Sequence, residues 1–277
     1  MTVLKKGGYD HALVLTPLKE QRKNRVEKKM GETYEALEKA QEGGENPNVR
    51  PVPSAQKAIE VMPLERSPLH VAMERYEDLK ANLLTRYPKE SLKVILFNST
   101  SQGSGCSTSA ATFAATLARD SQIKVLLIDT NLRTPGLHRL FKIPHAPGLS
   151  DIFNNGVKTS PKIRQVGPKN LYLLPCGEIY SGATALFESS RFDKFLTMTR
   201  ERFDHIILDA PPVPRFSESQ ILCAKVDGVV LVIEYGKDRR QVALMAKKKL
   251  EEAGGKLLGV VLNRRKYYIP EWIYRRL

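Results

Sequence analysis

The stretch STSQGSGCSTSAATFAATLA, from Ser99 to Ala118, decides the fold. The apolar run KVILFNS enters it and predicts a buried strand, glycines and hydroxyl residues turn the chain, and a helix of small residues follows. A strand, a glycine-rich turn and a helix are the parts of a phosphate-binding loop, whose backbone N–H groups surround a phosphate. Cys106 stands where that loop has a lysine, so the stretch alone leaves open whether it binds a nucleotide or is a plain turn.

The rest of the chain predicts strands that alternate with helices. Continuous apolar runs predict strands buried on both faces, and the helices between them predict right-handed βαβ units. We therefore expect an α/β domain with a mainly parallel central sheet flanked by helices. The carboxyl ends of such strands form the usual ligand-binding edge; here they are Ser99, Asp129, Asp209 and Asn263. The expected strands are 93–99, 124–129, 170–177, 205–212, 228–235 and 256–263, and the expected helices are 68–84, 107–120, 188–203 and 238–255.

The loop matches the phosphate-loop template in part. Thr100 replaces the first glycine and Cys106 the lysine, whereas Gly105 and Ser107 fit. Gly103 and Gly105 allow the backbone to curl around a phosphate, the following helix adds its positive end, and Ser107 is placed to reach Mg²⁺. The missing part is a mobile cation that neutralises charge on the transferred phosphate.

Two aspartates end strands next to this loop. Asp129 closes KVLLID, with Asn131 and Arg133 just beyond it, and Asp209 closes HIILD ahead of two prolines. A strand-terminal aspartate beside a phosphate loop is well placed to hold Mg²⁺ directly or through water. Aspartates also cap helices and turns at such places. The loop, Asp129 and Asp209 follow three strands in order, and this combination favours a nucleotide site over three unrelated turns.

Four segments in order carry a resemblance that spans about Pro68 to Asn263. They are SQGSGCST as Walker A, LLIDTNLRTPGLHRLF as Walker A′, PGLSDIF after it, and HIILDAPPV as Walker B. Together they resemble the bacterial tyrosine kinases of polysaccharide export and synthesis, of the CpsD/CapB-like cytoplasmic type. The resemblance implies a P-loop NTPase fold of the MinD/ParA kind. Ser101 stands where MinD/ParA proteins carry a further lysine, which favours the kinase branch over a ParA-like ATPase.

The resemblance implies an ATP- and Mg²⁺-dependent protein-tyrosine autokinase that acts in exopolysaccharide biosynthesis. It makes Asp129 and Asp209 catalytic, assigns Mg²⁺ to Ser107 and Asp209, and gives Asp129 the task of activating the tyrosine hydroxyl, which suits a carboxylate of raised pKa. The nucleotide would contact Gly103, Ser104, Gly105, Cys106, Ser107, Thr108, Asn131, Arg133, Asn263 and Arg264.

Several positions depart from the family pattern. Cys106 replaces the lysine and Asn131 replaces the second Walker A′ aspartate, so we expect weakened binding and weakened catalysis. A low-pKa, redox-sensitive thiol at Cys106 is a less favoured alternative. In the family's oligomerisation helix the matching residues are Glu74, Glu77 and Lys80, and the reversed charge at Glu77 counts against the ring-shaped octamer.

The ends of the chain predict a division into three parts. Residues 1–56 form a basic, partly helical tail and linker, residues 57–266 the kinase-like domain, and residues 267–277 a tail rich in tyrosine and arginine. In that last part Tyr267, Tyr268 and Tyr274 are candidate phosphoacceptors. The alternatives are an arm that packs Trp272 and Ile273 onto the domain, which we favour, and a segment that lies on an acidic membrane surface.

Charge and cysteine content indicate the compartment and the partners. The formal net charge of +14 predicts an anionic partner, and the absence of zinc-finger, helix-turn-helix and RNA-binding signatures argues against nucleic acid. Cysteines 106, 176 and 223 lack metal or redox spacing, which fits a reducing cytoplasm. We expect a cytoplasmic protein at the inner face of the plasma membrane, with a membrane-embedded polysaccharide chain-length or export protein, itself or a related kinase as partner. The alternative function is a catalytically dead regulatory or scaffolding paralogue.

Overall fold

The computed structural model describes residues 68–87, 92–152, 162–178 and 182–264, with the side chains of 68–75 left aside. The expected helix of the N-terminal tail, the linker and the tyrosines at 267, 268 and 274 lie outside these residues. Within them, no helix combines the length and the apolar character that a membrane crossing needs.

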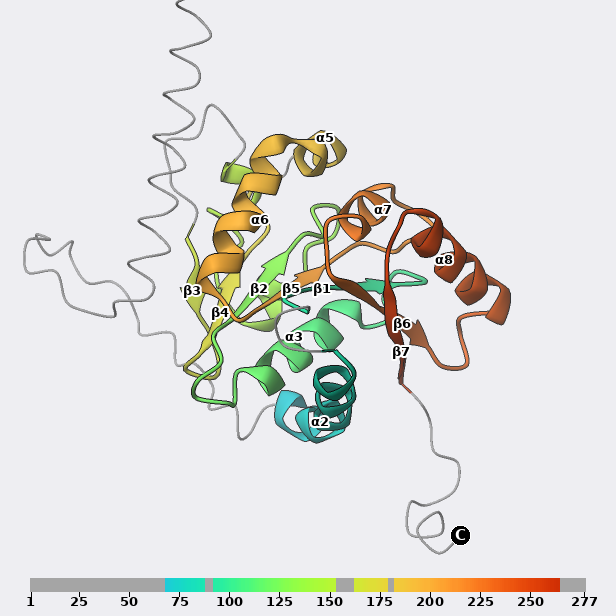
Figure 1. Cartoon of the computed structure of the whole chain (residues 1–277), viewed down its shortest axis with the longest axis horizontal. Helices are drawn as coiled ribbons and strands as arrows, with labels where there is room; N and C mark the ends of the chain where they lie inside the picture. Colours follow the sequence, from blue (N-terminus) through green and yellow to red (C-terminus); the bar gives the residue numbers. More distant parts are fainter. Residues whose placement is uncertain (1–67, 88–91, 153–161, 179–181, 265–277) are drawn as a thin grey trace, which may run out of the picture.

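One seven-stranded sheet forms the centre of the domain (Figure 1). Its order is β3-β4-β2-β5-β1-β6-β7, and every neighbouring pair is parallel except β3 with β4. The predicted mainly parallel sheet is therefore confirmed. The strands are β1 (Val94–Ser99), β2 (Val125–Asp129), β3 (Arg164–Gln165), β4 (Leu171–Leu174), β5 (His205–Asp209), β6 (Gly228–Glu234) and β7 (Leu257–Asn263).

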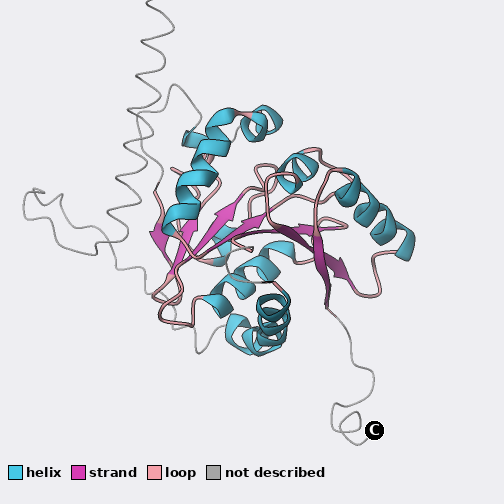
Figure 2. Ribbon diagram, in the orientation of Figure 1, coloured by secondary structure: helices cyan, strands magenta, loops and turns pink. Residues whose placement is uncertain are grey.

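Helices cover both faces of this sheet, so the domain has three layers (Figure 2). Helices α2 and α3 pack together on one face, and α5 to α8 cover the other. Buried apolar side chains fill both interfaces, which explains why the strand sequences are continuously apolar. The helices are α2 (Pro68–Arg86), α3 (Cys106–Leu117), α4 (Leu137–Leu140), α5 (Ala183–Glu188), α6 (Ser190–Arg202), α7 (Glu218–Cys223) and α8 (Arg240–Glu252), with a short 3₁₀ turn at Ser150–Ile152.

One expected helix is divided in the structure. The prediction of a single helix over 188–203 is wrong at its start, because Glu188 ends α5 and α6 begins only at Ser190. Ser189 between them has an extended backbone, and its side chain accepts a hydrogen bond from the Phe192 N–H. This is ordinary serine capping of a helix N-terminus, which separates the two helices.

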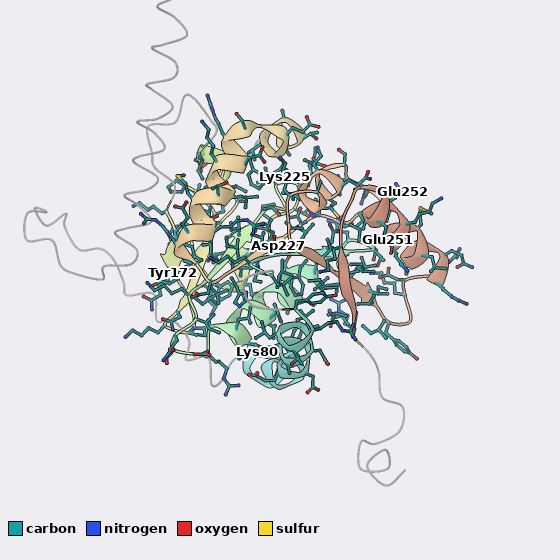
Figure 3. The ribbon with its side chains drawn as sticks, in the orientation of Figure 1. Lys80, Tyr172, Lys225, Asp227, Glu251 and Glu252 are labelled. Carbon is teal, nitrogen blue, oxygen red and sulfur yellow. The ribbon has the colours of Figure 1, made fainter. Side chains whose placement is uncertain are left out.

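At the amino-terminal ends of the strands, one carboxylate joins several elements by hydrogen bonds. Asp227, which is labelled in Figure 3, accepts hydrogen bonds from the backbone N–H groups of Lys93 and Val94. Its two carboxylate oxygens also accept one hydrogen bond each from the guanidinium of Arg200. These hydrogen bonds lower the pKa of Asp227 in spite of its partial burial, which acts in the opposite direction. These polar contacts tie α6 and β1 to the start of β6.

Candidate functional site

The turn between β1 and α3 has the backbone that its glycines allow. Gly103 and Gly105 have φ values of 83° and 85°, a left-handed conformation that residues with a Cβ atom rarely adopt. A Cβ at Gly105 would also lie 2.1 Å from Asn263 Nδ2, so both the conformation and the close approach require glycine there. The space around Gly103 is open.

This turn presents a set of unused N–H donors. No acceptor among the described residues receives the N–H groups of Gly103, Gly105, Cys106, Ser107 and Thr108. Three of them belong to the first turn of α3, where the helix dipole places its positive end. A phosphate is the anion that such a fan of donors fits. The loop prediction is therefore supported by geometry, although the lysine is missing.

Two residues from distant parts of the chain fix the loop in place. The carboxylate of Asp238, in the turn after β6, accepts hydrogen bonds from Thr100 Oγ1 at 2.5 Å and from Ser101 Oγ at 2.7 Å. Asn263, at the end of β7, donates from Nδ2 to the carbonyl oxygen of Ser104 at 2.8 Å. The loop is thus anchored where it begins and where it ends. Sequence reasoning missed Asp238, because nothing in its own neighbourhood marks it.

Asp209 is a buried carboxylate without a partner. It ends β5 at 0% exposure, and both of its carboxylate oxygens lack a hydrogen-bond donor in the structure. Burial first, and then the charge of Asp129, raise the pKa of Asp209 to about 8, while the nearby Ser107 hydroxyl and Cys106 thiol act in the opposite direction. An orphaned buried carboxylate of this kind is costly unless a cation joins it.

These residues fit Mg²⁺ bound together with a nucleotide. No group of three or more His, Cys, Asp or Glu side chains in the described part of the chain could hold a metal ion by itself. A phosphate-loop magnesium site does not need one, because a hydroxyl, one carboxylate, water and the phosphates complete the coordination. Ser107 and Asp209 would supply the hydroxyl and the carboxylate.

Asp129 lies beside Asp209 but is held differently. The two residues are Cα partners on the adjacent strands β2 and β5. Asp129 Oδ2 accepts the N–H groups of Gly136 and Leu137, both at 3.1 Å, and Oδ1 accepts that of Asn131 at 3.2 Å. Burial raises the pKa of Asp129 to about 6, although these three hydrogen bonds oppose the rise. Asp129 therefore caps α4 and is also a carboxylate that titrates near neutral pH.

Cys106 does not supply the charge of the missing lysine. Its thiol faces Ala210 at the end of β5, with Sγ 3.9 Å from that carbonyl oxygen. Burial raises the pKa of the Cys106 thiol well above its ordinary value, and the neighbouring Asp209 raises it further. The alternative of a low-pKa reactive thiol is therefore wrong: the side chain is a neutral thiol next to a carboxylate.

Three other predicted contact residues are engaged with protein partners in this structure. Asn131 Oδ1 accepts the Thr134 N–H at 3.0 Å and closes a turn. The Arg133 guanidinium lies 2.7 Å from the carboxylate of Glu218, a residue that is only 2% exposed. The structure thus brings together residues 103–108, Asp129, Asp209 and Asn263, whereas the side chains of Asn131 and Arg133 bond to protein groups. Arg264 also pairs with a carboxylate, that of Glu234 at 2.9 Å.

Comparison with known proteins identifies relatives of this chain. No protein-family profile matches the chain. CapB of Staphylococcus aureus is 30% identical over 212 residues, which cover 76% of this chain and 92% of CapB. The tyrosine-protein kinase YwqD of Bacillus subtilis is 30% identical over 199 residues, which cover 72% of this chain and 84% of YwqD.

Solved structures give the same result. The chimerical protein CapA2B2 superposes with a TM-score of 0.66 at 28% identity, over 73% of this chain and 87% of that one. The cell division ATPase MinD of Pyrococcus furiosus superposes with a TM-score of 0.53 at 21% identity, over 66% of this chain and 78% of that one, and so shares the P-loop fold. From the sequence relatives and the structural likeness together, the chain belongs to the bacterial tyrosine-protein kinases of the CapB, CpsD and YwqD type.

Proposed function

We propose that this protein is an ATP- and Mg²⁺-dependent protein-tyrosine autokinase of exopolysaccharide biosynthesis whose catalysis is weakened by the loss of the loop lysine. The observation that carries the proposal is the buried, unpartnered carboxylate of Asp209 beside five unused N–H groups. A decayed site would be expected to have replaced that carboxylate, because leaving it unpaired destabilises the fold.

The residues of the site divide the chemistry among them. Bound ATP·Mg²⁺ supplies the phosphoryl group that is transferred to the tyrosine oxygen. The N–H groups of residues 103–108 hold and orient phosphate oxygens, and Ser107 with Asp209 fixes the cation. Asp129 accepts the proton of the tyrosine hydroxyl; with a pKa of about 6 it is mostly ionised at neutral pH and can act as a general base. Its Oδ1 is the freer oxygen, since Oδ2 already accepts two N–H groups.

The neutral thiol at position 106 weakens this chemistry. In phosphoryl transfer the lysine neutralises charge that develops on the phosphate oxygens. Removal of one such electrostatic group commonly lowers a rate by about 10²- to 10³-fold. The guanidinium of Arg133 does not replace the lysine here, since it pairs with Glu218. We therefore place the loss in the transfer step more than in nucleotide binding.

We further propose that the protein works at the inner face of the plasma membrane with a membrane-embedded polysaccharide chain-length or export protein. The family supports this assignment, and so does the net charge of +14, because a strongly basic protein is attracted to the anionic lipids of that surface. The acceptor tyrosines that we propose, Tyr267, Tyr268 and Tyr274, lie in the terminal segment beyond the described residues.

A binding and transfer experiment tests the proposed function. The full chain is incubated with ATP and Mg²⁺, nucleotide binding is measured by calorimetry, and phosphotyrosine is located by mass spectrometry. We expect binding and slow phosphorylation in the wild type, and neither in Asp209→Ala. Wild-type protein that binds no nucleotide, or that binds it and never gains phosphotyrosine, would contradict the proposal and favour a regulatory paralogue.

A further inference from the structure

Strand β7 is an edge strand with an apolar surface. It is the last strand of the sheet and pairs only with β6 among the described residues. Val260 and Leu262 are 48% and 56% exposed. They are two positions apart and so project from the same side of the strand. Long edge strands with exposed apolar side chains attract other chains, so proteins normally cover or charge them.

The chain has a segment suited to cover this edge, and it begins where β7 ends. We call residues 265–277 the C-terminal arm; β7 ends at Asn263, two residues before it. Its stretch YYIPEWIY, residues 267–274, is mostly aromatic and aliphatic. Tyrosine, isoleucine and tryptophan favour strands, and a proline is tolerated in a strand at the edge of a sheet.

The backbone at the exit from β7 supports a change of direction. Arg264 has a φ of 56°, in the left-handed region that side chains other than glycine rarely adopt. Two contacts hold it there: its N–H donates to Asn263 Oδ1 at 2.9 Å, and its guanidinium donates to Glu234 Oε1 at 2.9 Å. Left-handed residues directly after a strand are typical of the short connections in β-hairpins.

We propose that the C-terminal arm docks on the free edge of β7 as an antiparallel strand and covers Val260 and Leu262. The length is sufficient, since the seven residues of β7 span about 23 Å and residues 267–274 can span about 26 Å. The docked arm satisfies the outward N–H and C=O groups of β7 and removes its apolar side chains from water. The occupant is this chain's own arm because it starts at the edge and needs no second molecule.

Docking has a consequence for phosphorylation, which rests on the function proposed above. Asp129 ends β2, and three strands, β5, β1 and β6, lie between β2 and β7. Four strand spacings amount to about 19 Å, so a tyrosine paired with β7 is far from the proposed base of its own molecule. The docked arm therefore keeps its tyrosines away from the base of the same molecule, and transfer within one molecule requires its release.

The single tryptophan of the chain, Trp272, makes the docking measurable. Tryptophan emission and its quenching by acrylamide are recorded for the full-length wild type, for Leu262→Ser and for the control Leu140→Ser. Leu140 is 37% exposed and lies on α4, the helix that follows β2. We expect a shielded tryptophan in the wild type and in the control, and a red shift with several-fold stronger quenching in Leu262→Ser. Circular dichroism checks that all three proteins are folded.

Hydrogen exchange gives a second measurement that does not depend on a point substitution. The full chain is compared with a chain that ends at Lys266, and exchange is followed in the peptide that contains β7. We expect the amides of 257–263 to exchange about tenfold faster without the arm, with those of β1 unchanged.

An exposed tryptophan in the wild type, or equal exchange in both chains, overturns the proposal. Shielding that appears only at high protein concentration or only with anionic vesicles also overturns it, in favour of a second copy or a membrane. None of these readouts needs ATP, so they can fail independently of the proposed function.

Discussion

Asp129 and Asp209 are Cα partners on adjacent parallel strands, and both carboxyl groups are fully buried. Two like charges so close together in a low-dielectric site oppose each other's ionisation, and Asp129 accordingly raises the pKa of Asp209. The two differ in what compensates them: three backbone N–H groups bond to Asp129, and none bonds to Asp209. A cation bound at Asp209 would offset the repulsion between the two carboxylates and would give Asp209 a partner.

This arrangement predicts a stability that falls as the pH rises. Asp209 has a pKa of about 8 in the folded protein and an ordinary value of 3.8 in the unfolded chain. Between these values the folded state holds a proton that the unfolded state has lost, so the free energy of unfolding decreases with pH. For each pH unit in this range, the free energy of unfolding falls by about 1.4 kcal/mol at most. We expect urea unfolding without nucleotide to show a marked loss of stability from pH 6 to pH 8.

Asp209→Asn tests the origin of that slope. The amide cannot ionise, so the variant should be more stable than the wild type at pH 8 and should change little between pH 6 and pH 8. Glu252→Gln, which removes an exposed carboxylate on α8 (Figure 3), serves as the control and should keep the wild-type slope. Equal slopes in wild type and Asp209→Asn would contradict the assignment.

Asp129→Asn should separate binding from transfer. The asparagine keeps an oxygen that can accept the N–H groups of Gly136 and Leu137, but it cannot take a proton from tyrosine. We expect ADP affinity close to the wild type and phosphotyrosine formation lower by about 10²-fold or more. In the wild type the transfer rate should fall below about pH 6, where Asp129 becomes protonated. A pH-independent rate from pH 5 to pH 8 would argue against Asp129 as the base.

Cys106→Lys should restore the missing cation. A lysine at the start of α3 can neutralise Asp209 in the free protein and phosphate charge in the complex, so we expect a gain in transfer rate of about 10²-fold. Cys106→Ser is the matched control, since it changes the side chain without adding charge. If the lysine variant is no faster than the serine variant, the lost lysine does not limit the reaction. Measured phosphotyrosine formation at saturating ATP decides between these outcomes.

The sequence predicts the parts of this site that follow strands, and it misses the parts that pair across the fold. Asp129, Asp209 and Asn263 each follow a continuous apolar run, so their gathering at one sheet edge follows from the parallel topology. Asp238 is 138 residues from Thr100 along the chain, and no local pattern links the two. The partner of Arg133 is equally hidden from the local sequence. The position of Arg133 in the Walker A′ segment predicts a phosphate contact, whereas in the structure it pairs with the buried Glu218 of α7.

The contact between Asp238 and the loop leads to the last prediction. Asp238→Ala removes the acceptor of the Thr100 and Ser101 hydroxyls, so the loop should sample conformations in which its N–H groups no longer converge. We expect ADP affinity to fall about tenfold, which corresponds to the loss of roughly one charged hydrogen bond. Asp238→Asn keeps one acceptor oxygen, so its ADP affinity should lie between those of the wild type and Asp238→Ala.

The thiol of Cys106 reports on the same loop without any nucleotide. It is partly buried next to Asp209 in the intact loop, so loosening of the loop should expose it further to iodoacetamide. We expect faster alkylation of Cys106 in Asp238→Ala than in wild type, measured by peptide mass, with the buried Cys176 and Cys223 unchanged as internal controls. Faster alkylation of all three cysteines would indicate general destabilisation instead, and an unchanged rate at Cys106 would show that Asp238 does not hold the loop.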